Sequence, residues 1–182
     1  LTLFTFLTKI QMSSDLINIK LGIIGKPNSG KSTLFNTLLG KTVSPVGDEY
    51  GLTKKLFKDA LVHKKHKLII VDTPGLRRKN KVLEKNELAR NIEVIKLMKN
   101  VEVIILLIDS SENITKQDFR LADLSISNNK ILFFLLNKID TIEDKKQFKL
   151  KLNKYLKNNY SKYKLINLEF ISAKKNIKLN DV

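Results

Sequence analysis

The sequence GKPNSGKS at residues 25–32 constrains the fold more than any other feature of the chain, because it matches the pattern G-x-x-x-x-G-K-[ST]. It follows the apolar run IKLGII (19–24), which predicts a buried strand. It opens the stretch KSTLFNTLLG (31–40), which predicts a helix that ends at Gly40. A strand, a glycine-rich turn and a helix in this order form a phosphate-binding loop, since backbone N–H groups and the helix N-terminus face the anion.

The rest of the chain alternates apolar runs with helical patterns, which predicts an α/β fold. Two adjacent antiparallel strands are expected on either side of the short basic run HKKHK, whose two histidines suit a hairpin turn better than a metal site. We predict a three-layer α/β/α P-loop NTPase fold, with a six-stranded, mostly parallel sheet and one antiparallel edge strand. The predicted strands are 19–24, 54–62, 67–72, 101–109, 130–137 and 166–172, and the predicted helices are 31–40, 84–100, 115–126 and 143–159.

Length and composition indicate one domain with its own core. Residues 1–17 are interpreted as an N-terminal extension that need not be native, with Met12 as a candidate natural start. Residues 18–182 are interpreted as the nucleotide-binding (G) domain, with its last helix truncated. The apolar segment at the start of the chain is too short to span a bilayer and lacks a preceding basic cluster. We expect a cytoplasmic, monomeric protein with no membrane partner.

The net charge is +16 and the chain contains no cysteine, which excludes disulfides and thiolate metal sites. A charge of this size fits a nucleic-acid partner, because dispersed Lys and Arg release counterions from a polyanion. Only four of the 34 basic residues are arginine, and a compositional bias towards lysine explains the charge equally well. The composition alone leaves both explanations open.

Phosphate and Mg²⁺ ligands are expected in the loop and at the end of the next core strand. Gly25 and Gly30 let the backbone wrap the phosphates, the Lys31 amine reaches the β- and γ-phosphates, and the Ser32 hydroxyl is a Mg²⁺ ligand. The run VDTPG (71–75) places Asp72 as a second Mg²⁺ residue and Gly75 as a γ-phosphate N–H donor. Ser29 and Thr33 complete this predicted set.

Two further motifs at strand ends point to guanine. In NKID (137–140), Asp140 can accept hydrogen bonds from guanine N1 and the exocyclic N2, whereas adenine offers no matching donors. Asn137 is expected to brace the loops, and the stem of Lys138 to lie along the base. In SAK, formed by Ser172, Ala173 and Lys174, the Ala173 N–H is expected to reach guanine O6. The predicted ligands are therefore GTP or GDP with Mg²⁺.

Over residues 18–176 the chain resembles the translation-factor-related (TRAFAC) P-loop GTPases. More narrowly, it resembles the second G domain of the Der (EngA) family of bacterial ribosome-assembly GTPases. The stretches that carry this resemblance are GKPNSGKSTLFNTLLG, GDEYGLTKK, DTPGLRRKNKVLEKNE and ITKQDFRLA. The resemblance implies a partner in the 50S ribosomal subunit or its rRNA. Der proteins have two G domains and a KH-like domain, so we expect this chain to be a fragment or a single-domain relative.

The resemblance also implies a mechanism. Leu76 stands where Ras-type GTPases have a water-orienting Gln, so slow intrinsic hydrolysis is expected. Thr53 is implied as a Mg²⁺-binding hydroxyl of the first switch, and Asn28 as a ligand of a K⁺ ion that replaces an arginine finger. Alternatively, Asn28 merely stabilises the tight turn. The implied catalytic residues are Lys31, Asn28, Thr53 and Gly75.

The function expected from these motifs is a K⁺-stimulated GTPase switch in assembly of the 50S subunit. Two alternatives stay open at this point. One is a noncatalytic Der-like fragment that retains nucleotide or RNA binding. The other is an RNA-associated GTPase of the Era or MnmE type, disfavoured for MnmE by the basic LRRKNKV after the D-T-P-G.

Overall fold

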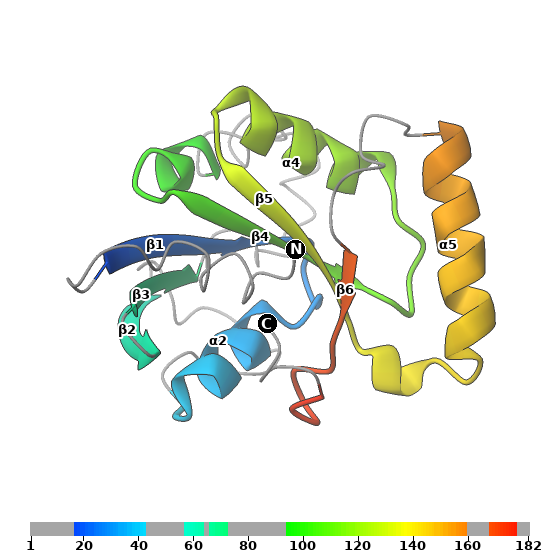
Figure 1. The fold of residues 1–182 in the computed structure, drawn as a ribbon, viewed down its shortest axis with the longest axis horizontal. Helices are drawn as coiled ribbons and strands as arrows, with labels where there is room; N and C mark the ends of the chain where they lie inside the picture. Colours follow the sequence, from blue (N-terminus) through cyan, green and yellow to red (C-terminus); the bar gives the residue numbers. More distant parts are fainter. Residues whose placement is uncertain (1–16, 43–56, 64–65, 73–93, 160–167, 178–182) are drawn as a thin grey trace, which may run out of the picture.

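The computed structural model describes residues 17–42, 57–63, 66–72, 94–159 and 168–177, and the statements below concern these residues (Figure 1). They form one six-stranded sheet with the strand order β2-β3-β1-β4-β5-β6. β2 pairs antiparallel with β3, and every other neighbouring pair is parallel. The predicted mostly parallel sheet with one antiparallel edge strand is therefore confirmed. The strands are β1 (Ile17–Ile24), β2 (Phe57–His63), β3 (His66–Asp72), β4 (Val103–Asp109), β5 (Ile131–Asn137) and β6 (Leu168–Phe170).

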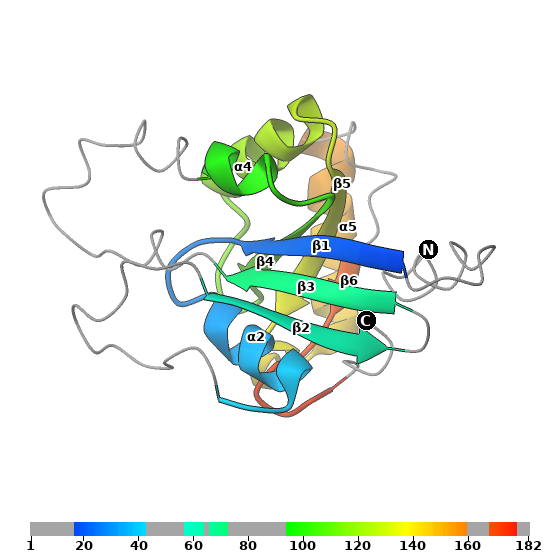
Figure 2. The same ribbon diagram turned by 90° about the vertical axis from the view of Figure 1, so that its left-hand side faces the viewer.

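Helices cover both faces of the sheet, which gives the predicted three layers (Figures 1 and 2). α2 (Lys31–Leu39) lies on one face, and α4 (Lys116–Ser127) and α5 (Lys145–Asn159) lie on the other. A short 3₁₀ turn, η3 (Ile139–Thr141), follows β5. Helix α2 ends where the sequence predicted, because Gly40 adopts a left-handed conformation with φ of 65°.

β4 explains why the helices fall on two sides. All seven of its side chains are buried, and the six apolar ones alternate between two separate cores. Val103, Ile105 and Leu107 pack with Leu34 and Phe35 of α2. The intervening side chains of β4 pack with α4 and α5 instead, in a cluster that includes Ile104, Leu106, Ile108, Phe119, Leu121, Ala122, Leu152 and Leu156. The continuous apolar run of the predicted strand 101–109 is thus explained by burial of β4 on both faces of the sheet.

The β2–β3 hairpin falls at the basic run HKKHK, as predicted, with His63 as the last residue of β2 and His66 as the first of β3. His63 and His66 pair with each other in the antiparallel register, and residues 64–65 lie outside the described part. Among the described residues there is no cluster of three or more His, Asp or Glu side chains suited to a metal ion.

Several predictions concern residues that the structure does not describe. The predicted loop 41–53 and the first part of the predicted helix 84–100 belong to this group, although residues 94–98 are helical. The N-terminal extension up to residue 16 and the final residues 178–182 also lie outside the described part. Within that part, no helix combines the length and apolar character needed to cross a bilayer.

The buried and exposed sides of α5 provide a matched test of this packing. Leu152 is 7% exposed and contacts the core, whereas Leu150 is 63% exposed on the same helix. We expect Leu152→Ala to lower the free energy of unfolding by about 2–4 kcal/mol, because it leaves a cavity. The control Leu150→Ala should change it by less than about 0.5 kcal/mol. Denaturant titration measures both, and equal losses would contradict the orientation of α5.

Candidate nucleotide-binding site

Those predicted site residues that the structure describes gather at one edge of the sheet, because parallel strands end on the same side. β1 leads into the phosphate loop, β3 ends at Asp72, β4 at Asp109 and β5 at Asn137. The segment 171–177 follows β6 at the same edge and is closed by a bridge between Ser172 and Ile177. Five chain segments far apart in sequence are thus brought together.

The two glycines of the phosphate loop are required by close backbone contacts. Gly25 has φ of 150°, and a Cβ atom there would lie 2.2 Å from the Leu107 carbonyl oxygen. Gly30 has φ of 92°, and a Cβ atom there would lie 2.3 Å from the Asn137 side-chain nitrogen. Any larger residue would displace β4 or Asn137. The pattern that identified this loop therefore has a packing reason as well as a ligand-binding one.

Asn28 is exposed and has a left-handed backbone with φ of 63°. Asparagine tolerates this conformation better than most residues with a side chain. The turn alone is therefore a sufficient reason for asparagine here. The predicted contact between Asn28 and K⁺ stays a prediction.

The first turn of α2 carries buried polar groups that face the loop. Lys31 is 3% exposed and Ser32 is 2% exposed. The Lys31 amine donates a hydrogen bond to the Lys26 carbonyl oxygen at 2.5 Å. The Ser29 hydroxyl is buried and has no hydrogen-bond partner within the described part of the chain. A buried polar group without a partner is unusual and marks a place where a ligand would be stabilised.

Asn137 joins three segments of the site. Its Nδ2 donates to the Ser29 carbonyl oxygen at 2.9 Å, and its Oδ1 accepts a hydrogen bond from the Ala173 N–H at 2.9 Å. The side chain is buried, so both bonds are shielded from water. The Ala173 N–H is thus bonded to Asn137 in this structure, and its predicted contact with guanine O6 stays a prediction.

Lys138 follows in a left-handed conformation with φ of 64°, and its amine forms an ion pair with Asp109. The Asp109 carboxylate also accepts hydrogen bonds from the Ser111 N–H and hydroxyl. Burial alone would raise the pKa of Asp109, but the bonds from Lys138 and Ser111 outweigh it, and the net pKa lies below the usual 3.8. Asp109 is thus a fixed anion that holds the Lys138 amine.

Asp140 lies beside the SAK segment. The Ser172 hydroxyl lowers the pKa of this carboxyl below its ordinary 3.8, against a smaller opposing effect of burial, and Lys175 assists. The Lys175 amine lies 3.6 Å from Asp140 Oδ2. The Asp140 carboxylate is therefore ionised at neutral pH, as an acceptor of two N–H donors should be.

The remaining predicted residues are less defined. Thr53 and Gly75 lie outside the described residues, and for Asp72 only the backbone is described, at the end of β3. The loop residue Thr33 lies in α2 and is half-buried, and Lys174 is exposed. Hence the structure brings together the phosphate loop, the NKID turn and the SAK segment, but it leaves the predicted metal ligands undetermined except for Ser32.

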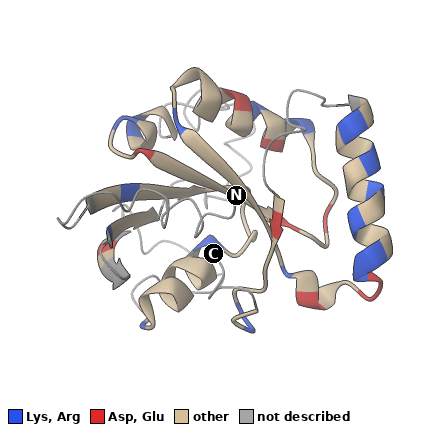
Figure 3. Cartoon of the chain, in the orientation of Figure 1, with Lys and Arg blue, Asp and Glu red and all other residues tan. Residues whose placement is uncertain are grey.

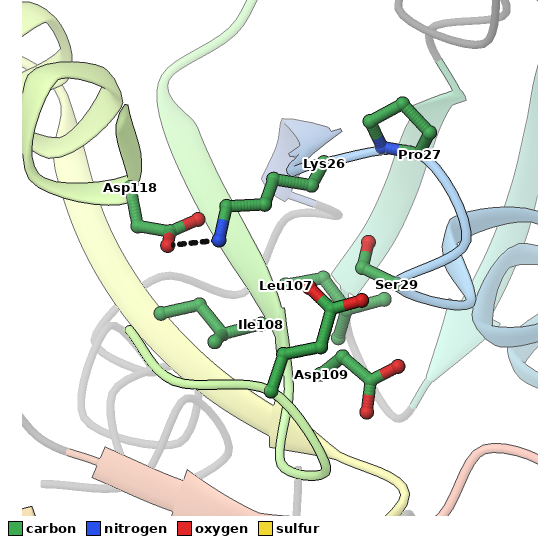
Figure 4. A pocket seen from close by; sticks show the side chains of 8 residues that line it. Lys26, Pro27, Ser29, Leu107, Ile108, Asp109 and Asp118 are labelled. Atoms are coloured by element: carbon green, nitrogen blue, oxygen red, sulfur yellow. Dashed lines mark ion pairs between the residues drawn. The ribbon is translucent and has the colours of Figure 1, made fainter. Parts of the chain in front are cut away.

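Sequence reasoning missed three charged residues beside the loop. Figure 4 shows a hollow lined by Lys26, Ser29, Asp109, Asp118 and neighbouring residues. Asp109 could have been found as the last residue of an apolar strand. Asp118 could have been found from the capping-box pattern T-x-x-D at residues 115–118. Nothing in the sequence predicted that Lys26 would contact Asp118.

A family model described as "50S ribosome-binding GTPase" matches residues 20–138, which include the phosphate loop and the start of the NKID turn. The chain belongs to this GTPase family. The match ends within the NKID turn, so it does not include Asp140 or the SAK segment.

Several bacterial relatives of this chain are named GTPase Der. The Fusobacterium nucleatum protein is 37% identical over 158 residues, which cover 85% of this chain and 36% of that protein. The Thermosipho africanus protein is 39% identical over 159 residues, with the same coverage of 85% and 36%. The chain thus spans about a third of the length of the curated relatives that it matches.

Solved structures of GTPases share the fold. Era of Aquifex aeolicus, crystallised with GDP and AlF₄⁻, is 28% identical with a TM-score of 0.73, over 91% of this chain and 54% of that one. A second Era structure, with MgGDPNP and a segment of 16S ribosomal RNA, has the same identity, TM-score and coverage.

Proposed function

We propose that the chain binds GTP and hydrolyses it to GDP and phosphate, and that it acts as a conformational switch. One observation carries the proposal: the Asn137 side chain is bonded both to the phosphate loop and to the SAK segment. A site for a guanine nucleotide must hold phosphate and base at fixed separation, and this side chain supports that arrangement. Membership of the GTPase family supports the reaction class.

Specificity for guanine is assigned to Asp140. Its carboxylate is held in the ionised form beside Ser172 and Lys175, so it can accept from guanine N1–H and N2–H. Adenine has no donor at these positions, and an unpaired carboxylate against it would be costly. The ion pair with Asp109 keeps the Lys138 amine away from the base, which leaves the aliphatic stem of Lys138 to lie along it.

The phosphates would lie in the loop, where Gly25 and Gly30 have no side chain and the Ser29 hydroxyl has no partner in the described structure. Lys31 would exchange its bond to the Lys26 carbonyl for a bond to the β- and γ-phosphates. Ser32, Thr53 and Asp72 are the residues proposed to hold Mg²⁺, which neutralises charge on the phosphate oxygens when bound. The buried position of Ser32 in the first turn of α2 fits this assignment.

Hydrolysis is proposed to be slow without a stimulating factor. Leu76 cannot orient an attacking water, and the remaining groups are Lys31, the backbone amides of the loop and Gly75. We further propose that Asn28 contributes its amide oxygen to a K⁺ ion, which supplies positive charge when bound. The exposure of Asn28 at the tip of the loop leaves its side chain accessible for such a role.

The proposed partner is the 50S ribosomal subunit, contacted through α5. The helix has six lysines and no acidic residue among its 15 residues (Figure 3). Lys146, Lys154 and Lys157 are exposed and follow the spacing of one helix face, with the exposed Leu150 between them. A row of lysines of this kind suits contact with RNA phosphates. The Era structure with 16S ribosomal RNA shows that a relative of this fold binds ribosomal RNA.

Base choice can be tested by thermal melting with nucleotides. We expect GTP, and not ATP, to raise the melting temperature of the wild-type chain. Asp140→Asn should weaken GTP binding by about a hundredfold, the size of two lost hydrogen bonds to a charged group, and should favour xanthosine triphosphate. The control Glu143→Gln removes a nearby exposed acid and should behave like the wild type. Unchanged GTP preference in Asp140→Asn would refute the role of Asp140.

The role of K⁺ can be separated from that of the turn by Asn28→Gly. Glycine accepts the left-handed backbone at this position but lacks the amide oxygen. We expect hydrolysis to be about tenfold faster or more in KCl than in NaCl at equal ionic strength, and this difference to vanish in Asn28→Gly, because charge at the β–γ bridge accelerates transfer. GDP affinity should stay close to that of the wild type. If Asn28→Gly keeps the KCl advantage, Asn28 serves the turn only.

The proposed α5 contact can be tested by sedimentation with purified 50S subunits across a range of KCl concentrations. We expect the variant with Lys146→Gln, Lys154→Gln and Lys157→Gln to bind more weakly, with a salt slope smaller by about 2 to 3. The control replaces the exposed Lys67, Lys99 and Lys116 by Gln, which removes the same net charge elsewhere. Equal weakening in both variants would show that the overall charge matters, and not α5.

A further inference from the structure

Lys26 and Asp118 form an ion pair that connects the phosphate loop to α4. The Lys26 amine lies 2.7 Å from Asp118 Oδ2, and the two side chains are 17% and 1% exposed. In Figure 4 the Lys26 side chain extends from the loop across the hollow to Asp118. The two residues are 92 positions apart in the sequence: Lys26 directly follows Gly25, and Asp118 lies in the first turn of α4.

The Asp118 carboxylate is fixed in place by its own helix. The same Oδ2 atom accepts hydrogen bonds from the Thr115 N–H at 2.8 Å and the Thr115 hydroxyl at 3.0 Å. The bond from the Thr115 N–H is one half of a capping box, in which the Thr115 side chain in turn accepts from the Asp118 N–H, and the adjacent Phe119 is buried in the core. The other oxygen, Oδ1, is buried and has no hydrogen-bond partner in the described part of the chain. A buried carboxylate with an unbonded oxygen depends strongly on a cation, and the Lys26 amine is paired with it.

The backbone of Lys26 is in turn connected to the catalytic lysine proposed above. Its carbonyl oxygen accepts the Lys31 amine at 2.5 Å and the Ser29 N–H at 3.4 Å. The preceding residue, Gly25, lies against the Leu107 carbonyl with no room for a side chain. The loop is therefore held at Lys26 through the ion pair, and at Ser29 through Asn137. Lys26 therefore links α4 to Lys31, through its amine on one side and its carbonyl oxygen on the other.

We propose that Lys26 and Asp118 are positioning residues for the phosphate site. The ion pair fixes the first turn of the loop. The Lys26 carbonyl, Lys31 and the N–H groups of the loop are therefore held in their binding positions before a nucleotide enters. Neither side chain needs to touch the nucleotide. Preorganisation of this kind strengthens binding because less conformational entropy of the loop is lost when the ligand binds. The inference rests on the proposed nucleotide function, and it adds α4 to the elements that control it.

The test compares GDP with guanosine, which has the base but no phosphate. We expect Lys26→Met to weaken GDP binding by about tenfold, the size of one lost hydrogen bond to a charged group, and to leave guanosine binding unchanged. Lys26→Arg keeps the charge and should stay within about threefold of the wild type in GDP affinity. The control Lys41→Met breaks the Lys41–Asp59 pair of 2.6 Å just beyond the C-terminal end of α2, where Lys41 is 57% exposed. It should bind GDP like the wild type.

A second variant guards against a simple loss of folding. Lys26→Met combined with Asp118→Asn leaves no buried charge unpaired, and asparagine still offers an oxygen to the Thr115 N–H. We expect this double variant to melt closer to the wild type than Lys26→Met does, yet to show the same loss of GDP affinity.

Wild-type GDP affinity in either folded variant would overturn the positioning role. So would an equal loss for GDP and guanosine, which would indicate general disruption. If the wild-type chain itself bound no GDP, the proposed function would fail together with this inference, and that result is distinct from a failure of the variants alone.

Discussion

The site depends on one buried amide. Asn137 ends β5, and its side chain donates to the phosphate loop and accepts from the SAK segment. Because a Cβ atom on Gly30 would collide with Asn137, the second glycine of the loop and this asparagine require each other. An aspartate of the same shape could not donate to the Ser29 carbonyl. The spacing between the phosphate end and the base end of the site is thus set by a single residue type at one strand end.

Charges around this amide are arranged in pairs that are fixed by local structure. Asp109 is held by the turn at Ser111 and pairs with Lys138, while Asp118 is held by the capping box at Thr115 and pairs with Lys26. In each pair the carboxylate belongs to a rigid turn or helix end, and the lysine belongs to a segment proposed to contact the nucleotide. The stabilisation by Asp109 is present above its ordinary pKa of 3.8 and is lost as the pH falls through its lower folded value, so the segment of Lys138 keeps this support at neutral pH.

Much of the fold could be predicted because apolar patterns report burial directly. The apolar runs predicted as strands at 101–109 and 130–137 contain the central strands β4 and β5, and the predicted helix 31–40 contains α2. The Lys26–Asp118 pair could not be predicted, because lysine and aspartate are usually exposed and no local pattern joins residues 92 positions apart. The bond from the Ala173 N–H to Asn137 could not be predicted for a related reason, since it depends on where the buried Asn137 oxygen lies. Contacts of this kind are set by the packing of whole elements.

The two explanations of the net charge can be compared on two helices that cover the same face of the sheet. α4 carries both signs, with Lys116 and Arg120 interspersed with Asp118 and Asp123. α5 carries lysine alone, and its outward row has Leu150 in its centre. A compositional bias towards lysine would act on both helices, and nothing in the packing of α5 excludes acidic residues from its exposed side. The uneven distribution of acidic residues, more than the total of +16, therefore supports an anionic partner at α5.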